Sequence, residues 1–262
     1  MKLAVSNIAW DTHDDPGVFS VLRENGVQGI EIAPSKVWPN WNGANSSSAK
    51  EYRKRLSNEG FEVPALQAIL FGKPELQLFV PKTKHALIEH IKYISEIGSA
   101  LGAKVLVFGA PKNRRKGQLS TNEAVNYAVE IMREVGDICS EFELCIGWEH
   151  NPIEYGCDFI TNAADARDFV NLIDSPGIQL HLDSAGIHMC GGNISEVIRS
   201  AGPFVHYHIS EPMLAPLVGG VIDHKTSIQT LKDLDYKNWV SIEMKSVEQK
   251  RLLESINLIH GV

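Results

Sequence analysis

Short apolar runs alternate with longer amphipathic stretches along the chain. The apolar runs have the length of strands, and the stretches between them repeat their apolar residues with a helical period. This alternation is typical of a parallel sheet built from repeated strand–helix units. The predicted strands are residues 2–10, 29–34, 62–69, 104–110, 143–150, 178–184, 204–210 and 239–245. The predicted helices are residues 16–25, 47–58, 82–101, 122–140, 162–173, 194–201, 224–234 and 247–259.

Polar residues inside these strands follow the two-residue period of a β-strand. In the segment WVSIEMK, Val240, Ile242 and Met244 share one face, while Glu243 and Lys245 share the other. The segments ELCIGWE and IQLHLD divide in the same way. Such strands meet helices with their apolar face, and their second face lines the interior of a barrel.

Eight strand–helix units predict one α/β fold, a (β/α)8 TIM barrel over residues 1–262. The chain has 262 residues, close to the roughly 250 that are usual for such a barrel. No low-complexity linker interrupts the alternation, so we expect a single domain. The predicted strand-to-helix loops are long, whereas the helix-to-strand loops are tight. Because barrel enzymes carry their active sites at the carboxyl ends of the strands, the site is expected among the long loops.

Charge and cysteine content narrow the class of protein. A formal net charge of −7 argues against nonspecific nucleic-acid binding, which needs clustered Lys and Arg. No apolar run approaches the roughly 20 residues of a membrane span, and the first ten residues fit a buried strand better than a signal peptide. The four cysteines show no CxxC spacing, so neither a zinc knuckle nor a redox pair is indicated. We therefore expect a cytoplasmic protein with reduced thiols, without membrane or nucleic-acid partners.

Three carboxylates and one imidazole stand near the ends of four consecutive predicted strands. They are Glu149, Asp183, His208 and Glu243, separated by 25 to 35 residues. A single carboxylate there usually caps the next helix or lies on the surface. Four such side chains on the inward faces of adjacent strands are costly to bury unless a cation satisfies them. Because three oxygen ligands and one nitrogen suit Mn, Mg, Co or Zn, the pattern predicts one divalent metal ion, with an internal salt-bridge network as the competing interpretation.

The segments that carry these residues resemble a known family. WEHNP, HLDSAG, HYHISE and SIEM, in this order and at these separations, are similar to the xylose isomerase-like barrel superfamily. Within it, the chain resembles the sugar phosphate isomerase/epimerase group, which includes ketose 3-epimerases, hydroxypyruvate isomerases and inosose dehydratases. The resemblance covers the whole chain and implies that Glu149, Asp183, His208 and Glu243 are the metal ligands. His206, the neighbouring inward residue, is expected to have a structural role as a hydrogen-bonded interior histidine.

The positions at which the ketose 3-epimerases contact the sugar carry other residues in this chain. That pattern has a His three residues after the metal Asp, where this chain has Gly186, with His188 two residues later. It has an Arg six residues after the metal His, where this chain has Leu214. It has a Glu six residues after the first metal Glu, where this chain has Tyr155, with Glu154 one place early. We take His188 and Glu154 as candidate substrate-binding residues, and the resemblance does not extend to a particular ketose.

The resemblance implies sugar chemistry through an enediolate. The C–H next to a metal-held sugar carbonyl has a lowered pKa. Glu149 and Glu243 come from strands separated by two others, so they can face opposite sides of the bound carbon skeleton. Proton removal by one and return by the other gives epimerisation, and a shuttle between neighbouring carbons gives isomerisation. We therefore expect a metal-dependent isomerase or epimerase of carbohydrate metabolism, with these two glutamates as the acid/base pair.

Other residues at the expected barrel mouth are candidates for substrate binding. Gln67 shares the inward parity of its strand and can donate to a substrate hydroxyl or serve as a satisfied barrel amide. Glu31 is inward on the second strand and is expected to orient a neighbour. Arg114 and Lys245 favour an anionic group on the substrate, phosphate or carboxylate, with a solvated loop charge as the competing interpretation for each.

Three other functions stay open at this point. A metal-dependent dehydratase of the inosose type would use the same ligand set. An AP-endonuclease-like phosphodiesterase shares the superfamily fold but needs a three-zinc cluster with many His ligands, and His85 and His90 fall in a predicted helix while His260 directly follows another. A non-catalytic sugar-binding barrel could lose both proton-shuttling glutamates, and both are present. The expected partner is a small carbohydrate substrate, and a homo-oligomer is compatible with this prediction.

Overall fold

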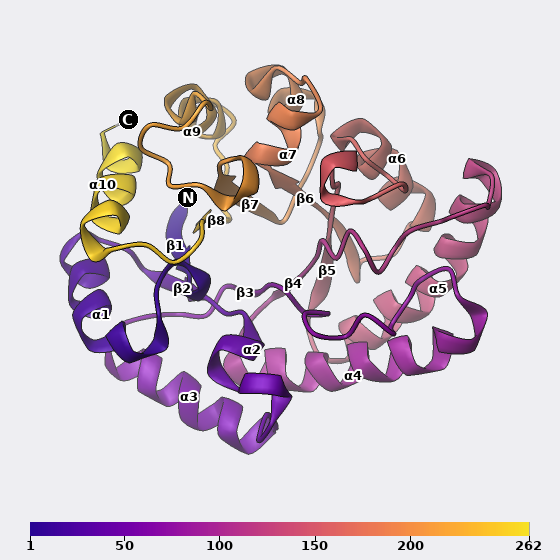
Figure 1. The fold of residues 1–262 in the computed structure, drawn as a ribbon, viewed down its shortest axis with the longest axis horizontal. Coiled ribbons are helices and arrows are strands. Elements are labelled where there is room, and N and C mark those ends of the chain that lie inside the picture. The colour runs from indigo at the N-terminus through magenta and orange to yellow at the C-terminus, as the bar shows by residue number, and fades with distance from the viewer. Residues whose placement is uncertain (262) are drawn as a thin grey trace.

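Eight parallel strands form a ring in the computed structural model, which describes residues 1–261 (Figure 1). Neighbouring strands pair in the order β2-β1-β8-β7-β6-β5-β4-β3. The ring closes between β2 and β3, where Gly29 bridges Glu62 and Ile32 bridges Leu66. The strands are β1 (Lys2–Ser6), β2 (Gly29–Glu31), β3 (Ala65–Leu66), β4 (Val105–Phe108), β5 (Cys145–Glu149), β6 (Ile178–Asp183), β7 (His206–Ser210) and β8 (Trp239–Glu243). The predicted TIM barrel is confirmed.

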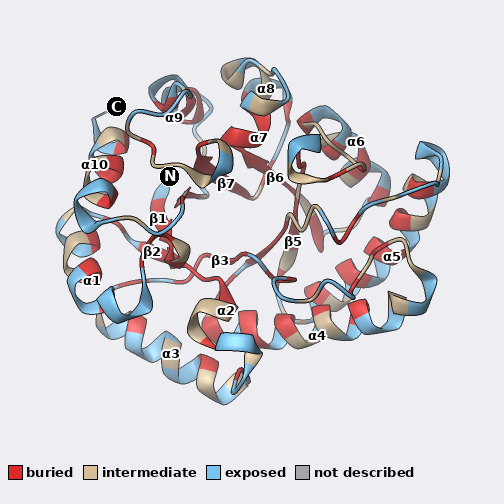
Figure 2. Ribbon diagram, in the orientation of Figure 1, coloured by how far each residue is buried: buried red, intermediate tan, exposed pale blue. Residues whose placement is uncertain are grey.

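Helices lie outside the ring, one main helix after each strand (Figure 1). Figure 2 shows that the helices are buried toward the strands and exposed on their outer faces. All eight predicted helices are present, within two residues of the predicted ends. They are α1 (Asp15–Glu24), α3 (Ser46–Asn58), α4 (Lys84–Leu101), α5 (Thr121–Glu141), α6 (Ala163–Ile173), α8 (Ile194–Ser200), α9 (His224–Asp233) and α10 (Gln249–His260). Two short helices, α2 (Pro34–Val37) and α7 (Ser184–Met189), were not predicted.

Several strands end earlier than their apolar runs predict. The first strand stops at Ser6, because the side-chain oxygen of Asn7 accepts a hydrogen bond from the backbone nitrogen of Ala33 (2.8 Å) and the chain turns there into a 3-10 helix. The third strand has only two residues, and Ala68 beyond it adopts a left-handed φ of 53°. Residues just past the strand ends therefore belong to the loops that surround the barrel mouth.

The apolar core lies mainly between the barrel and the helices. Trp148 shows how it is packed: its ring stacks on Phe108 and contacts Phe169, and it is fully buried. Inside the barrel, a small cluster of Ala65, Val105 and Val107 fills one end. Other interior positions are polar, so the barrel also carries buried polar side chains that need partners.

None of the helices within residues 1–261 is both long enough and apolar enough to cross a membrane.

Candidate functional site

The four predicted metal ligands meet at the carboxyl end of the barrel. Glu149, Asp183 and Glu243 are the last residues of β5, β6 and β8, and His208 lies in β7. Asp183 pairs with His208 in the β6–β7 ladder, while Glu149 pairs with His181 and Glu243 pairs with Ser210 on the neighbouring ladders. All four line one cavity of about 580 Å³. Residues that are 25 to 35 positions apart in the sequence thus surround one space.

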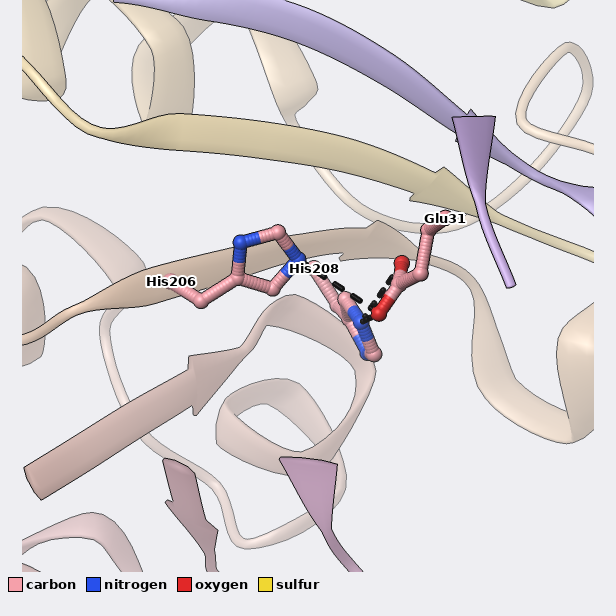
Figure 3. A group of neighbouring side chains, drawn as sticks. All are labelled: Glu31, His206 and His208. Atoms are coloured by element: carbon pink, nitrogen blue, oxygen red, sulfur yellow. Dashed lines mark hydrogen bonds and ion pairs between the residues drawn. The ribbon is translucent and has the colours of Figure 1, made fainter. Parts of the chain in front are cut away.

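The two ring nitrogens of His208 face different carboxylates, and Figure 3 shows the Glu31 carboxylate beside the ring. Nε2 lies 3.0 and 3.1 Å from the two oxygens of Glu31, which is fully buried. Nδ1 lies 3.3 Å from Oε2 of Glu243 and 3.9 Å from Oε1 of Glu149, and has no hydrogen-bond partner among residues 1–261. Burial acts to raise the pKa of Glu31, but His208 and His206 hold it well below its ordinary value. An anionic Glu31 accepts a hydrogen bond from Nε2–H, so Nδ1 is the nitrogen that faces the cavity. Burial acts to lower the pKa of His208, but Glu31 and Glu243 raise it well above its ordinary value, so a cation would replace the proton on Nδ1.

Asp183 is held by both of its oxygens. As the N-cap of α7, it accepts a hydrogen bond from the backbone nitrogen of Gly186 (2.5 Å), and its other oxygen accepts one from the Ser210 hydroxyl. Burial, and then the nearby Glu243, raise the pKa of Asp183 to about 6. The carboxylate is therefore fixed in place, and its ionised form is unfavourable unless a nearby positive charge compensates it.

Glu149 is positioned by a glycine and an amide. Its Oε2 accepts a hydrogen bond from Nδ2 of Asn151 (3.1 Å). A Cβ at Gly109 would lie 2.1 Å from the same oxygen, so only glycine leaves room for it. Burial, and then Asp183, raise the pKa of Glu149 to about 8. Oε1 points the other way, 3.7 Å from Nε2 of the buried His181.

These residues fit a divalent metal ion. Three carboxylates meet around an imidazole nitrogen that has no other partner, and two of them have raised pKa values that a cation would lower. Asp183, His208 and Glu243 offer ligand atoms within 4.8 Å of one another, and so do Glu149, His181 and His208. Oxygen and imidazole ligands are those of Mn, Co, Zn and, with fewer nitrogens, Mg.

A layer of histidines lies beneath this site. His181 and His206 are buried, and their rings stack with centroids 5.5 Å apart. Nε2 of His206 lies 3.5 Å from Oε1 of Glu31 (Figure 3). His206 therefore contacts the residue that orients His208, and it is absent from the group formed by Asp183, His208 and Glu243. Sequence reasoning did not single out His181, although it shares the inward parity of Asp183.

His150 takes the space that the ketose 3-epimerase pattern gives to another histidine. A Cβ at Gly186 would lie 2.8 Å from Nε2 of His150. His150 is buried and lines the cavity. Burial, and then the charge of Arg114, lower its pKa to about 4, so the ring is neutral at neutral pH. Sequence reasoning missed His150, because its parity places it with Trp148 on the outward face of β5.

Two of the five predicted substrate-binding residues line the cavity. Gln67 does so, with its Nε2 donating to the Ser6 hydroxyl, and Lys245 does so from the end of β8. Lys73 and Lys112, from the loops after β3 and β4, also line it.

The other three do not line this cavity. Arg114 has no exposed surface and is packed over Trp148, with Cζ 4.8 Å from the ring centroid. Its loop turns inward because Asn113 donates to the backbone oxygens of the neighbouring loop (2.8 Å). His188 is exposed on α7, and Glu154 is exposed on a 3-10 turn from which Tyr155 lines the cavity instead.

Unusual backbone conformations gather around the cavity. Ala68, Ala110, Met213 and Leu214 all line it and have φ values of 53°, 42°, 59° and 58°. A left-handed conformation costs a non-glycine residue about 1 kcal/mol or more. Such strain is found where a fold positions functional side chains.

The match to a family model decides the relationship. Residues 19–259 match the model of the xylose isomerase-like TIM barrel. The chain belongs to this family. Inosose isomerase of Bacillus subtilis (strain 168) is 23% identical over 183 residues, and the match covers 65% of this chain and 64% of that protein.

Several solved structures share the whole barrel with this chain. D-psicose 3-epimerase, in the presence of D-fructose, superposes with a TM-score of 0.82 at 15% identity, over 100% of this chain and 98% of the other. The 3-keto-D-glucoside 4-epimerase of E. coli superposes with a TM-score of 0.80 at 16% identity, over 100% of both chains. The IOLI protein with a binding zinc atom gives 0.74 at 21% identity, over 100% and 96%. At these identities, the likeness is one of fold.

Proposed function

We propose that the protein is a metal-dependent isomerase or epimerase of a sugar, sugar phosphate or related polyhydroxy carbonyl compound. The proposal rests on the arrangement around His208. Glu31 is hydrogen-bonded to Nε2, and three carboxylates of the cavity lie around Nδ1. Relatives named as inosose isomerase and as sugar epimerases support this class of reaction.

Glu149, Asp183, His208 and Glu243 would hold one divalent ion, Mn, Co, Mg or Zn. Bound there, the ion would polarise a substrate carbonyl and lower the pKa of the neighbouring C–H. A relative with a bound zinc supports a metal in this fold. Without an ion, burial and then the mutual repulsion of these carboxylates raise the pKa values of Glu149 and Asp183.

Glu149 and Glu243 move the proton in this proposal. They project from β5 and β8, with β6 and β7 between them, so they approach the cavity from different sides. One carboxylate removes the proton next to the carbonyl and the other returns it, which inverts the carbon; return to the neighbouring carbon gives isomerisation. Asn151 holds Oε2 of Glu149 for this role. Gln67, neutral His150 and Lys245 line the same cavity and would bind substrate oxygens.

Hydrogen exchange in D₂O tests the proposal directly. The metal-loaded protein is incubated with free ketoses, sugar phosphates, an inosose and hydroxypyruvate, and proton loss is followed by NMR. We expect exchange at the carbon next to a carbonyl in at least one substrate, and its absence in Glu149→Gln and Glu243→Gln. Water loss from a cyclic polyol ketone would instead identify a dehydratase, the reaction named for another structural relative, a probable 3-DHS dehydratase (TM-score 0.77). No exchange and no water loss would contradict an enzyme of either kind.

A further inference from the structure

The cavity is larger than one sugar ring requires. Its volume of about 580 Å³ lies within the roughly 300 to 1,000 Å³ of pockets that bury drug-sized ligands. A monosaccharide held at Glu149, Asp183, His208 and Glu243 would occupy the end at which the strands terminate. The outer part of the cavity, between the loops, is then available to a second portion of the substrate.

The outer part is apolar on two opposite walls. Phe71, with Ile69 and Leu70, comes from the loop after β3, and Met213 and Leu214 come from the loop after β7. In the closed ring, β3 and β7 are four strands apart, which places the two loops across the mouth from each other. The phenyl group of Phe71 is 67% exposed and the side chain of Met213 is 53% exposed, so both have surface to bury.

The protein holds these apolar walls in place at a cost. The backbone oxygen of Phe71 accepts a hydrogen bond from Nε1 of Trp41 (3.1 Å). The backbone nitrogen of Met213 donates a hydrogen bond to the Tyr155 hydroxyl (3.0 Å). The backbone oxygen of Leu214 accepts one from the backbone nitrogen of Lys245 (2.8 Å). Met213 and Leu214 are both left-handed, a conformation that would relax if nothing fixed it. Exposed apolar side chains on a segment that is strained and held by hydrogen bonds indicate a surface that binds an apolar group of a ligand.

We propose that this wall is a subsite for an aromatic substituent on the substrate. The inference rests on the function proposed above: the polyhydroxylated part of the substrate meets the metal ligands, and an aryl group attached to it lies between Phe71 and Met213. An aromatic ring suits these walls because it packs favourably against both a phenyl ring and a thioether. Leu214 completes the subsite at the position where the ketose 3-epimerase pattern places an arginine. The substrate class is thus an aryl glycoside or a comparable aryl-substituted polyol ketone.

Binding of unreactive probes tests the subsite without turnover. Dissociation constants of phenyl β-D-glucopyranoside, methyl β-D-glucopyranoside and glucose 6-phosphate are measured by titration calorimetry on the metal-loaded protein. We expect the phenyl glucoside to bind roughly tenfold or more tightly than the methyl glucoside, because the two differ in an apolar ring that becomes buried. Equal binding of the two glucosides, no binding of either, or a preference for glucose 6-phosphate overturns the proposal.

Two alanine variants locate the effect. Phe71→Ala and Met213→Ala are expected to bring the ratio of the two dissociation constants close to one, while the metal dissociation constant stays the same. Alanine keeps the Cβ of Met213, so its left-handed backbone is not altered. Leu234→Ala is the matched control, an exposed apolar residue that does not line the cavity, and it should keep the ratio. If a second copy of the chain covers this wall, the variants change the sedimentation coefficient and not the ratio, which also overturns the proposal.

Failure of the subsite and failure of the proposed reaction give different results. Deuterium exchange together with equal dissociation constants for the two glucosides removes only the subsite. Tighter binding of the phenyl glucoside without exchange on any substrate leaves the subsite and removes the isomerase.

Discussion

His208 and Glu31 form a buried pair in which Nε2 of the imidazole lies 3.0 Å from the carboxylate. This contact joins β7 to β2 and leaves Nδ1 facing the cavity. The pair therefore links the folding of the barrel to the orientation of one ligand.

Loss of the charge on Glu31 should weaken metal binding. In Glu31→Gln the shape is kept, but Nε2 of His208 loses an anionic acceptor, so Nδ1 is a poorer ligand. Changes of this kind cost about 10- to 100-fold in metal affinity. The metal dissociation constant of the purified variant is measured by calorimetry, with Glu62→Gln as the control, since that carboxylate pairs with Lys2 at the surface. Equal affinities in Glu31→Gln and the parent protein would rule out this role.

Neutralising either proposed proton carrier should abolish turnover. Glu149→Gln and Glu243→Gln keep the side-chain volume and remove the group that takes or returns the proton, an effect of at least about 10²-fold. Initial rates and circular dichroism are measured together. Glu143→Gln, an exposed residue two positions before β5, is the control. A variant that retains the parent rate would show that its carboxylate is not part of the acid/base pair.

A methyl group at position 109 should displace the Glu149 carboxylate. The φ of Gly109 is not in the left-handed region, so Gly109→Ala leaves the backbone unstrained, but its Cβ would lie 2.1 Å from Oε2. We expect kcat to fall roughly 100-fold or more, because a catalytic group moved by about 1 Å loses its alignment. Gly17→Ala is the matched control, with its nearest atom at 3.8 Å. Unchanged kcat in Gly109→Ala would mean that the carboxylate has other productive positions.

Without metal, the protein should lose stability as the pH rises from about 7 to about 8, above the range in which the buried histidines with lowered pKa values act in the opposite direction. Burial, and then neighbouring carboxylates, raise the pKa of Glu149 to about 8 and that of Asp183 to about 6. In this range the folded state holds protons that the unfolded chain has released, so the free energy of unfolding falls with rising pH. Metal displaces those protons, and its affinity should rise over the same range.

Thermal unfolding across this pH range, with chelator and with added Mn, Co, Mg or Zn, measures both effects. The Glu149→Gln, Asp183→Asn double variant should show a flatter pH dependence with chelator. A Tm that rises with pH in the metal-free protein, or no stabilisation by any of the four metals together with no metal found by elemental analysis, would contradict the metal site.

Replacement of Arg114 should leave substrate binding unchanged. Its guanidinium is buried, and none of its three nitrogens has a hydrogen-bond partner among residues 1–261. Arg114→Met removes an unpaired buried charge and keeps a side chain of similar length against Trp148, so we expect Tm to rise or stay the same. Lys245→Ala, which changes a cavity residue, is the comparison for KM with anionic substrates. A large increase in KM for Arg114→Met alone would restore the predicted anion-binding role.

The barrel could be predicted because its signals are local. The two-residue alternation in WVSIEMK and the helical period of the stretches between strands depend only on neighbours in the chain. For the same reason the positions of Glu149, Asp183 and Glu243 at strand ends could be read directly. The ends of β1 and β3 could not, because Asn7 accepts a hydrogen bond from Ala33, just beyond the neighbouring strand β2, and Ala68 takes a left-handed turn.

The sequence alone determined the eight units, the single barrel and the four polar residues that converge at its carboxyl end. Only the tertiary structure decided what each loop residue faces. Arg114 was predicted at the mouth and is buried on Trp148, while His150 has the strand parity of the outward-facing Trp148 and yet lines the cavity beside Gly186. The physical reason is that strand parity follows from the pleat of one segment, whereas the surroundings of a loop side chain depend on contacts with loops that are distant in sequence.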